Sequence, residues 1–233
     1  MGSIATTTSV DTPEVLLGGH GRPDQHALDF ATRLRRARLG LIVALVGIVM
    51  IFVSYSSAYV VRQGLPTLDP RSGTLVRDWL PLQLPRFLLI NTLVLLISTV
   101  TMELARRQSA REVAAEFAAP SSSHYRVERM PWLGLTVILG LSFLSGQWLV
   151  WSELGARGFY VATSPSSSFF YLLTGIHGIH LFGGVLALLG ASAISLLRRS
   201  VTSRAVVVDV TAWYWHFMTF LWVYILCLLE FAR

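Results

Sequence analysis

Three histidines lie within long apolar stretches of this 233-residue chain, where a side chain that can carry a charge is costly. His177 and His180 are three residues apart, so they share one face if their segment is helical. His216 lies in the last stretch, directly after a tryptophan–tyrosine–tryptophan run. Such histidines could bind a metal ion if further ligands joined them. Alternatively, His216 with His177 or His180 could ligate a haem between two helices.

The sequence favours hydrogen bonding within a helical bundle over either of these sites. The helical rise gives His180 and His216 an axial offset of about 7 Å, which two haem ligands tolerate, so a haem is not excluded by geometry. However, no carboxylate or thiolate that would complete a metal site is evident near these histidines. The one cysteine, Cys227, permits neither an internal disulfide nor a cysteine-rich metal centre. We therefore expect the chain alone to bind neither haem nor metal.

Other polar side chains in the apolar stretches are further candidates for function. Serine and threonine often bond back to their own helix, which is the simpler interpretation for them. Glu103 lies one helical turn from Arg106 and Arg107, which predicts an ion pair at the membrane surface. Glu153 lies near the end of its stretch and could meet water there. The set comprises Asn91, Thr92, Ser98, Thr101, Glu103, Gln147, Glu153 and Thr219.

Composition indicates the environment of these residues. Hydrophobic residues make up 53% of the chain and charged residues only 14%, whereas a soluble domain carries about 25% charged residues. Charge-free runs approach or exceed the roughly 20 residues that a helix needs to cross a bilayer. The sequence therefore predicts an all-α integral membrane bundle of five transmembrane helices, at about residues 39–62, 86–107, 131–153, 168–197 and 207–231.

The distribution of arginine predicts the orientation. All 19 basic residues are arginines, and 13 of them fall on the side that holds the N-terminus. This asymmetry predicts a cytoplasmic, partly mobile N-terminal segment at residues 1–38 and a membrane domain at 39–233 that ends outside. Because the arginines lie at helix ends and in loops, we expect no nucleic-acid partner. The fourth helix carries Gly183, Ala187, Gly190 and Ala191 on one face, which predicts close packing by that face.

Four motifs occur in order between about residues 81 and 226. The first is an Asn91-Thr92 pair followed by a Leu-Leu-x-Ser run, and the second pairs Gln147 with Glu153 at a helix end. The third is TGIHGIH at residues 174–180, and the fourth is the Trp-His-Phe run at residues 215–217. Together they resemble subunit III of the haem-copper terminal oxidases, the group of cytochrome c and quinol oxidases. Five helices match the short form of that family, which lacks two N-terminal helices.

The resemblance implies a non-catalytic subunit with two helix groups around a lipid cleft. It implies no catalytic, cofactor-binding or metal-binding residue in this chain, with haem and copper in partner subunits I and II and bound phospholipid in the cleft. The implied partners are subunit I in direct contact, subunit II, small subunits and membrane lipids. The implied role is to stabilise subunit I and to support sustained proton uptake in a bacterial plasma membrane, with a cytochrome c oxidase favoured over a quinol oxidase. His216 would then be a hydrogen-bonding residue of the bundle interior. The implied structural or lipid-cleft residues are Asn91, Thr92, Gln147, Glu153, His177, His180, Trp215 and His216.

Three departures from the family pattern each remove an acid. The first helix has no carboxylate, and Thr219 and Val150 stand where acidic residues are usual. We therefore expect a structural and lipid contribution from this chain and no proton relay. The alternatives are a homologue associated with nitric oxide reductase and a membrane haem b carrier. A small transporter is disfavoured because the sequence shows neither internal repeats nor broken helices.

Overall fold

Five long helices account for most of the chain. The computed structural model describes residues 21–68, 73–76, 79, 85–118, 131–196 and 200–231. Each helix is long and apolar enough to cross a membrane, which confirms the predicted all-α membrane bundle. The helices are α1 (Gly21–Gly64), α2 (Phe87–Ala118), α3 (Pro131–Ala156), α4 (Pro165–Leu196) and α5 (Val201–Phe231).

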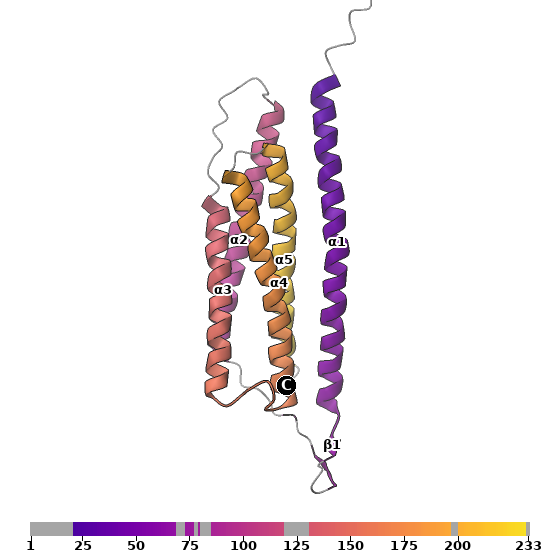
Figure 1. Ribbon diagram of the computed structural model, residues 1–233, viewed down its shortest axis with the longest axis vertical. Helices are drawn as coiled ribbons and strands as arrows, with labels where there is room; N and C mark the ends of the chain where they lie inside the picture. Colours follow the sequence, from indigo (N-terminus) through magenta and orange to yellow (C-terminus); the bar gives the residue numbers. More distant parts are fainter. Residues whose placement is uncertain are drawn as a thin grey trace, which may run out of the picture.

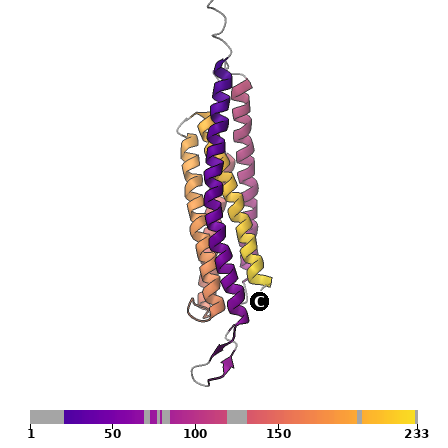
Figure 2. The same ribbon diagram turned by 90° about the vertical axis from the view of Figure 1, so that its right-hand side faces the viewer.

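The helices run side by side along one axis and alternate in direction (Figure 1). Helices α2, α3, α4 and α5 form a four-helix group, in which α2 packs on α3 and α5, and α4 packs on α5 and α3. Helix α1 lies against α4 and α5 at one side of this group (Figures 1 and 2). Only 11% of its most apolar segment is buried within the chain, against 39–44% for the other four helices. Most of the apolar surface of α1 is therefore available to lipid or to another subunit.

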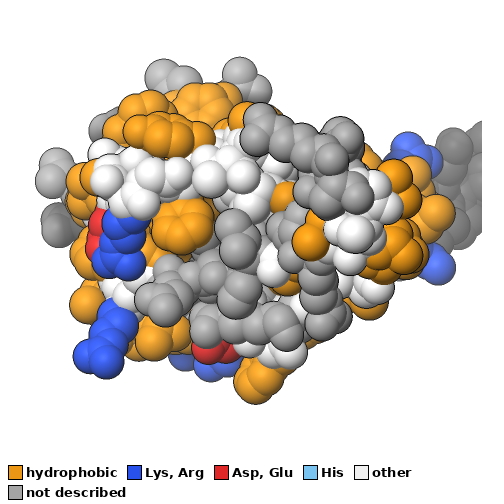
Figure 3. Space-filling view, turned by 90° about the horizontal axis from the view of Figure 1, so that it is seen from below, with side chains coloured by type: hydrophobic (Ala, Val, Ile, Leu, Met, Phe, Trp, Pro, Cys, Tyr) orange, Lys and Arg blue, Asp and Glu red, His pale blue; other side chains and the backbone are white. Residues whose placement is uncertain are grey.

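The two ends of the bundle differ in charge. We call the end at which α1, α3 and α5 begin the Arg-rich end. Eight arginines whose side chains the structure describes lie there: Arg33, Arg35, Arg36, Arg38, Arg106, Arg107, Arg111 and Arg204. The opposite end, the hairpin end, carries β1 (Thr67–Leu68) paired antiparallel with β2 (Leu75–Val76). Seen from the hairpin end, the charged side chains that are visible lie toward the edge of the molecule (Figure 3).

Local sequence signals explain where the helices begin. Helix α4 has Pro165 at its first position, where a missing backbone N–H costs little. Ser164 caps it: the Ser167 backbone N–H donates to Ser164 Oγ at 3.3 Å, and the Ser164 N–H donates to Ser167 Oγ at 3.1 Å. This is the reciprocal arrangement of a capping box. Helix α1 begins in a polar segment well before its apolar run, because alanine, leucine and arginine all favour helix. Its 44 residues span about 66 Å, roughly twice the hydrocarbon thickness.

The packing face of α4 differs from the one predicted. Gly183 and Gly190 point to open space, so the prediction that this small-residue face packs closely was wrong for them. The helix instead packs through Gly184, where a Cβ atom would lie 2.9 Å from the Tyr214 ring of α5. The larger side chains Leu181 and Val185 share that buried face. The orientation of α4 is therefore set by burial of Leu181 and Val185 and by the space that Gly184 leaves for the Tyr214 ring.

Close approach of α2 and α3 depends on one glycine. A Cβ atom on Gly146 would lie 2.3 Å from Asn91 Oδ1, so Gly146→Ala must displace the Asn91 side chain from its hydrogen bond to the Phe143 carbonyl. We expect this substitution to lower the free energy of unfolding by about 1–3 kcal/mol, as overpacking does elsewhere. Denaturant titration in mixed micelles would measure it. Gly134→Ala is the matched control on the same helix, because nothing lies within 4 Å of its Cβ position. Equal stability of the two variants would contradict the prediction.

Candidate functional site

Two tryptophans of α5 anchor the polar interior of the four-helix group. The indole N–H of Trp215 donates to Ser98 Oγ of α2 at 3.0 Å, and that of Trp222 donates to Thr92 Oγ1 at 3.0 Å. Both rings are almost fully buried. Asn91 joins α2 to α3 by donating from Nδ2 to the Phe143 carbonyl at 3.1 Å. The predicted candidates Asn91, Thr92 and Trp215 thus all make contacts between helices.

Two pairs of hydroxyl groups also join helices in this interior. Thr101 of α2 meets Thr136 of α3 at 2.8 Å between their Oγ1 atoms. Thr99 of α2 meets Thr219 of α5 at 2.7 Å. Thr219 therefore forms a neutral hydroxyl contact between two helices. The residue also donates to the carbonyl of Trp215 in its own helix.

His177 of α4 is completely buried among aromatic rings. Its ring lies 5.1 Å from the Trp222 ring and 6.3 Å from the Phe143 ring, measured between centroids. Neither ring nitrogen has a hydrogen-bond partner in the structure, and the same holds for both side-chain polar atoms of the buried Gln147. These two predicted candidates therefore differ from the others, because their hydrogen-bonding capacity is not used within the chain.

His180 and His216 lie in different surroundings from His177. His180 is half-buried, with Nδ1 2.8 Å from the Ile176 carbonyl and its ring 6.1 Å from Phe52 of α1. His216 is about one-third exposed, and its Nε2 lies 3.4 Å from Glu103 Oε2. The structure thus gives each of the three histidines its own set of neighbours. Within the described residues, no group of three or more histidine, cysteine or acidic side chains is placed to hold a metal ion.

Charged side chains of three helices meet near the Arg-rich end, and we call them the charged cluster: Arg38, Glu103, Arg106, Arg107 and Asp209. Arg38 of α1 donates to both carboxylate oxygens of Asp209 of α5, at 2.8 and 2.9 Å. Arg106 of α2 bridges Asp209 at 3.5 Å and Glu103 at 2.7 Å. Arg107 also donates to Glu103, at 2.8 Å. The predicted pairing of Glu103 with its two arginine neighbours is therefore present, and Asp209 extends it to α1 and α5.

Asp209 was not among the candidates from the sequence. A usable signal existed, because it is the one acidic residue between Arg204 and Glu230 in α5. An acid within an apolar helix needs a partner, and here the partners come from α1 and α2. The Asp209 side chain is only 12% exposed, and its carboxylate accepts from both Arg38 and Arg106.

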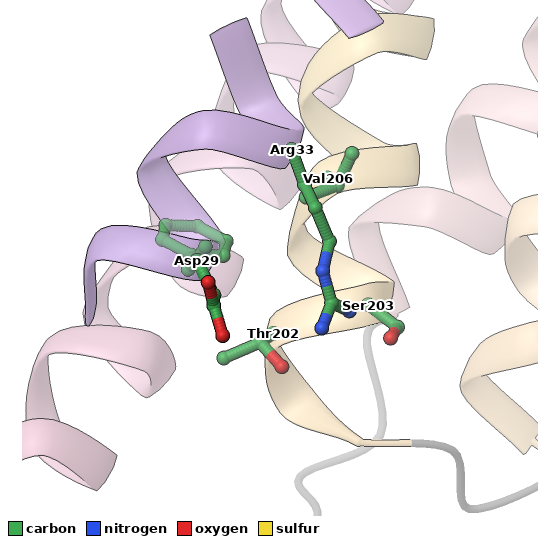
Figure 4. Close-up of a pocket in the computed structure, with 6 residues that line it drawn as sticks. Asp29, Arg33, Thr202, Ser203 and Val206 are labelled. Carbon is green, nitrogen blue, oxygen red and sulfur yellow. The ribbon is translucent and has the colours of Figure 1, made fainter. Parts of the chain in front are cut away.

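A small hollow lies between α1 and α5 beyond the charged cluster, with a volume of about 250 Å³. Asp29, Phe30 and Arg33 of α1 line it together with the start of α5 (Figure 4). The side chain of Arg33 extends from α1 toward Ser203 (Figure 4).

At the other end of the bundle, Glu153 of α3 is about two-fifths exposed and pairs with Arg157 one turn away. It contacts no other helix through an ion pair in the described part of the chain.

Comparison with known proteins assigns the chain to a family. The family described as cytochrome c oxidase subunit III matches residues 25–231, which is nearly the whole chain. This chain belongs to the cytochrome c oxidase subunit III family. Family membership and the five apolar helices together make the chain a multi-pass membrane protein.

Relatives of this chain occur in bacteria and in a plant. A cytochrome c oxidase subunit 3 of Thermostichus vulcanus is 30% identical over 194 residues, which cover 82% of this chain and 85% of the relative. A subunit 3 of Triticum aestivum is 29% identical over 195 residues, covering 81% and 65%. A probable subunit 3 of Mycobacterium leprae is 29% identical over 142 residues, covering 61% of this chain. The chain spans slightly under two thirds of that relative, 64% of its length.

Proposed function

We propose that this chain is a non-catalytic membrane subunit of a proton-pumping aerobic haem-copper oxidase, of the cytochrome c oxidase type. One observation supports this role above the others: several polar side chains of the interior bond helix to helix, as the Trp215–Ser98 and Trp222–Thr92 contacts do. Such contacts stabilise a bundle and offer nothing to a haem or a copper ion. Haem and copper would lie in partner subunits I and II, and the chain would stabilise subunit I.

The exposed apolar surface of α1 supports a role in holding lipid and neighbouring subunits. Only a small part of the apolar segment of α1 is covered by α4 and α5, so lipid tails or subunit I would cover the rest. A lipid cleft between α1 and the four-helix group is part of this proposal. The candidates Asn91, Thr92, Gln147, His177, His180 and His216 would then serve packing and lipid retention, while the partner subunit takes up protons.

The charge difference between the ends supports an orientation in a bacterial plasma membrane. Arginines are retained on the cytoplasmic side of membrane proteins. Eight arginines with described side chains lie at the Arg-rich end, whereas Arg62, Arg86 and Arg157 lie at the hairpin end. The Arg-rich end, with the N-terminus, would face the cytoplasm, and the C-terminus would face outside.

Removal of this subunit from the purified oxidase tests the proposed role. The initial rate of oxygen reduction should remain close to that of the intact complex, because the redox ligands lie in other subunits. Activity should then decay faster during turnover, and proton uptake should become more sensitive to pH, because the flank of subunit I has lost its covering helices and lipids. Full activity retained over many turnovers would refute the protective role.

Glu153 provides a test of whether a carboxylate of this chain conducts protons. Its pairing with Arg157 is partly exposed, and exposed ion pairs contribute about 0–1 kcal/mol. We expect Glu153→Gln to change the stability of the complex by no more than about 1 kcal/mol and to leave the rate of proton uptake unchanged. Stopped-flow proton uptake and thermal inactivation would measure both quantities, with Arg157→Gln as the matched variant. Slow proton uptake in a normally assembled Glu153→Gln oxidase would contradict the structural assignment.

A further inference from the structure

Two buried polar side chains of neighbouring helices have unused hydrogen-bonding capacity. The Gln147 side chain of α3 is 3% exposed and the His177 side chain of α4 is 0% exposed. All four of their polar atoms are without a hydrogen-bond partner. Buried polar groups in folded proteins are nearly always hydrogen-bonded, to protein or to ordered water, because leaving them unpaired is costly. The pair therefore requires an explanation.

The register of α3 against α4 places Gln147 and His177 at the same level. The indole N–H of Trp151 of α3 donates to Thr174 Oγ1 of α4 at 3.2 Å. Gln147 lies one turn before Trp151 in α3, and His177 lies one turn after Thr174 in α4. Because the two helices are antiparallel, both steps lead toward the same end of the bundle. One more turn along α3 lies Phe143, whose ring contacts the ring of His177. Gln147 is thus bracketed on α3 by two residues that touch the buried face of α4.

Two polar groups near this position are already engaged. The hydroxyl of Thr174 already donates to the Phe170 carbonyl and accepts from Trp151. The indole N–H of Trp222, which lies beside His177, donates to Thr92. Rings of Trp222 and Phe143 line the side of His177 and exclude lipid and bulk water from it.

We propose that Gln147 and His177 bind at least one ordered water molecule between α3 and α4. A neutral imidazole offers one donor and one acceptor, and a primary amide offers both kinds of group. A water molecule matches this set because it donates and accepts, and two to four polar partners hold it in buried sites. A metal cation does not match, because the described groups at this position include no carboxylate or thiolate. The bridging water fixes the spacing of α3 and α4. The proposed oxidase role does not depend on this water site.

A high-resolution map of the full chain in its native membrane assembly tests the proposal directly. We expect density for water within hydrogen-bond distance of the Gln147 amide and of one ring nitrogen of His177. A direct hydrogen bond between the two side chains, or a dry contact without density, would overturn the proposal. This measurement uses the native sequence and does not depend on whether a variant folds.

Infrared spectroscopy in water enriched with oxygen-18 provides an independent measurement. The native assembly should show an O–H stretching band of buried water that shifts with the isotope. The double variant Gln147→Leu/His177→Leu should lose this band, whereas Ser145→Ala should keep it, because Ser145 is an exposed residue of α3 that bonds the Leu141 carbonyl of its own helix. If the isotope-sensitive bands of the folded double variant equal those of the native assembly, no water is held by this pair, and the assignment is overturned.

Discussion

Replacing Trp215 by alanine should lower the free energy of unfolding by about 3 kcal/mol, the lower end of the range for deleting a large buried aromatic ring. The Trp215 side chain is completely buried in α5, and it contacts two helices where glycines admit its ring. A Cβ atom on Gly140 of α3 would lie 2.7 Å from the ring, and one on Gly184 of α4 would lie 3.3 Å from it. The two glycines themselves carry no side chains that could fill the cavity.

The lower end of the range applies because the chain unfolds into lipid. Lipid tails are as apolar as a protein core, so transfer from water contributes little to association of membrane helices. The cost of Trp215→Ala then comes from lost dispersion contacts, from the cavity, and from the hydroxyl of Ser98, which loses the indole N–H as a partner. Trp215→Phe removes the N–H but retains most of the ring, so its smaller loss would isolate the hydrogen bond.

Denaturant titration in mixed micelles would measure these free energies. Trp148→Ala is the matched control, because Trp148 lies on α3 with 70% of its surface exposed. We expect this control to change stability by no more than about 0.5 kcal/mol, as surface substitutions do. Similar losses for the two tryptophan variants would show that the Trp215 ring does not fill the junction of α3, α4 and α5.

The number and placement of the helices could be predicted from the sequence because the apolar runs are long and separated by charge. The predicted spans lie within the observed helices to within about three residues at most ends, but three helices extend further at the Arg-rich end. Helix α1 starts at Gly21, α2 continues to Ala118 and α5 starts at Val201. Hydropathy locates the part of a helix in the bilayer, and it carries no information on a polar helix that continues into water.

The candidate site could be predicted only where its contacts are local. Glu103 and Arg106 are three residues apart, so helical periodicity alone pairs them. The bonds from Arg38 and Arg106 to Asp209 join residues separated by 171 and 103 positions, and only the packing of α1 and α2 on α5 brings them together. His216 illustrates the same limit: its place beside Glu103 depends on the rotation of α5, which the aromatic residues around it in the sequence do not specify.

A second ion pair at the Arg-rich end, between Arg204 and Glu112, is the place where removing a charge should destabilise the chain most. Arg204 in the first turn of α5 pairs with Glu112 of α2, and Gln108 lies 3.5 Å from the same carboxylate. The Arg204 side chain is only 2% exposed, whereas the Glu112 side chain is 15% exposed. The guanidinium therefore depends on Glu112 for its neutralisation, and its Nε atom has no hydrogen-bond partner in the structure.

Glu112→Leu should therefore destabilise the chain by about 3–5 kcal/mol, because it leaves a buried positive charge without its partner. Arg204→Met should cost less, because the remaining Glu112 carboxylate lies nearer to water. The double variant Glu112→Leu/Arg204→Met should recover most of the stability, since exchanging a buried ion pair for apolar side chains is often neutral. Unfolding titrations of the four proteins form a double-mutant cycle that measures this coupling. A double variant as unstable as Glu112→Leu would show that packing of the glutamate stem, and not an uncompensated charge, causes the loss.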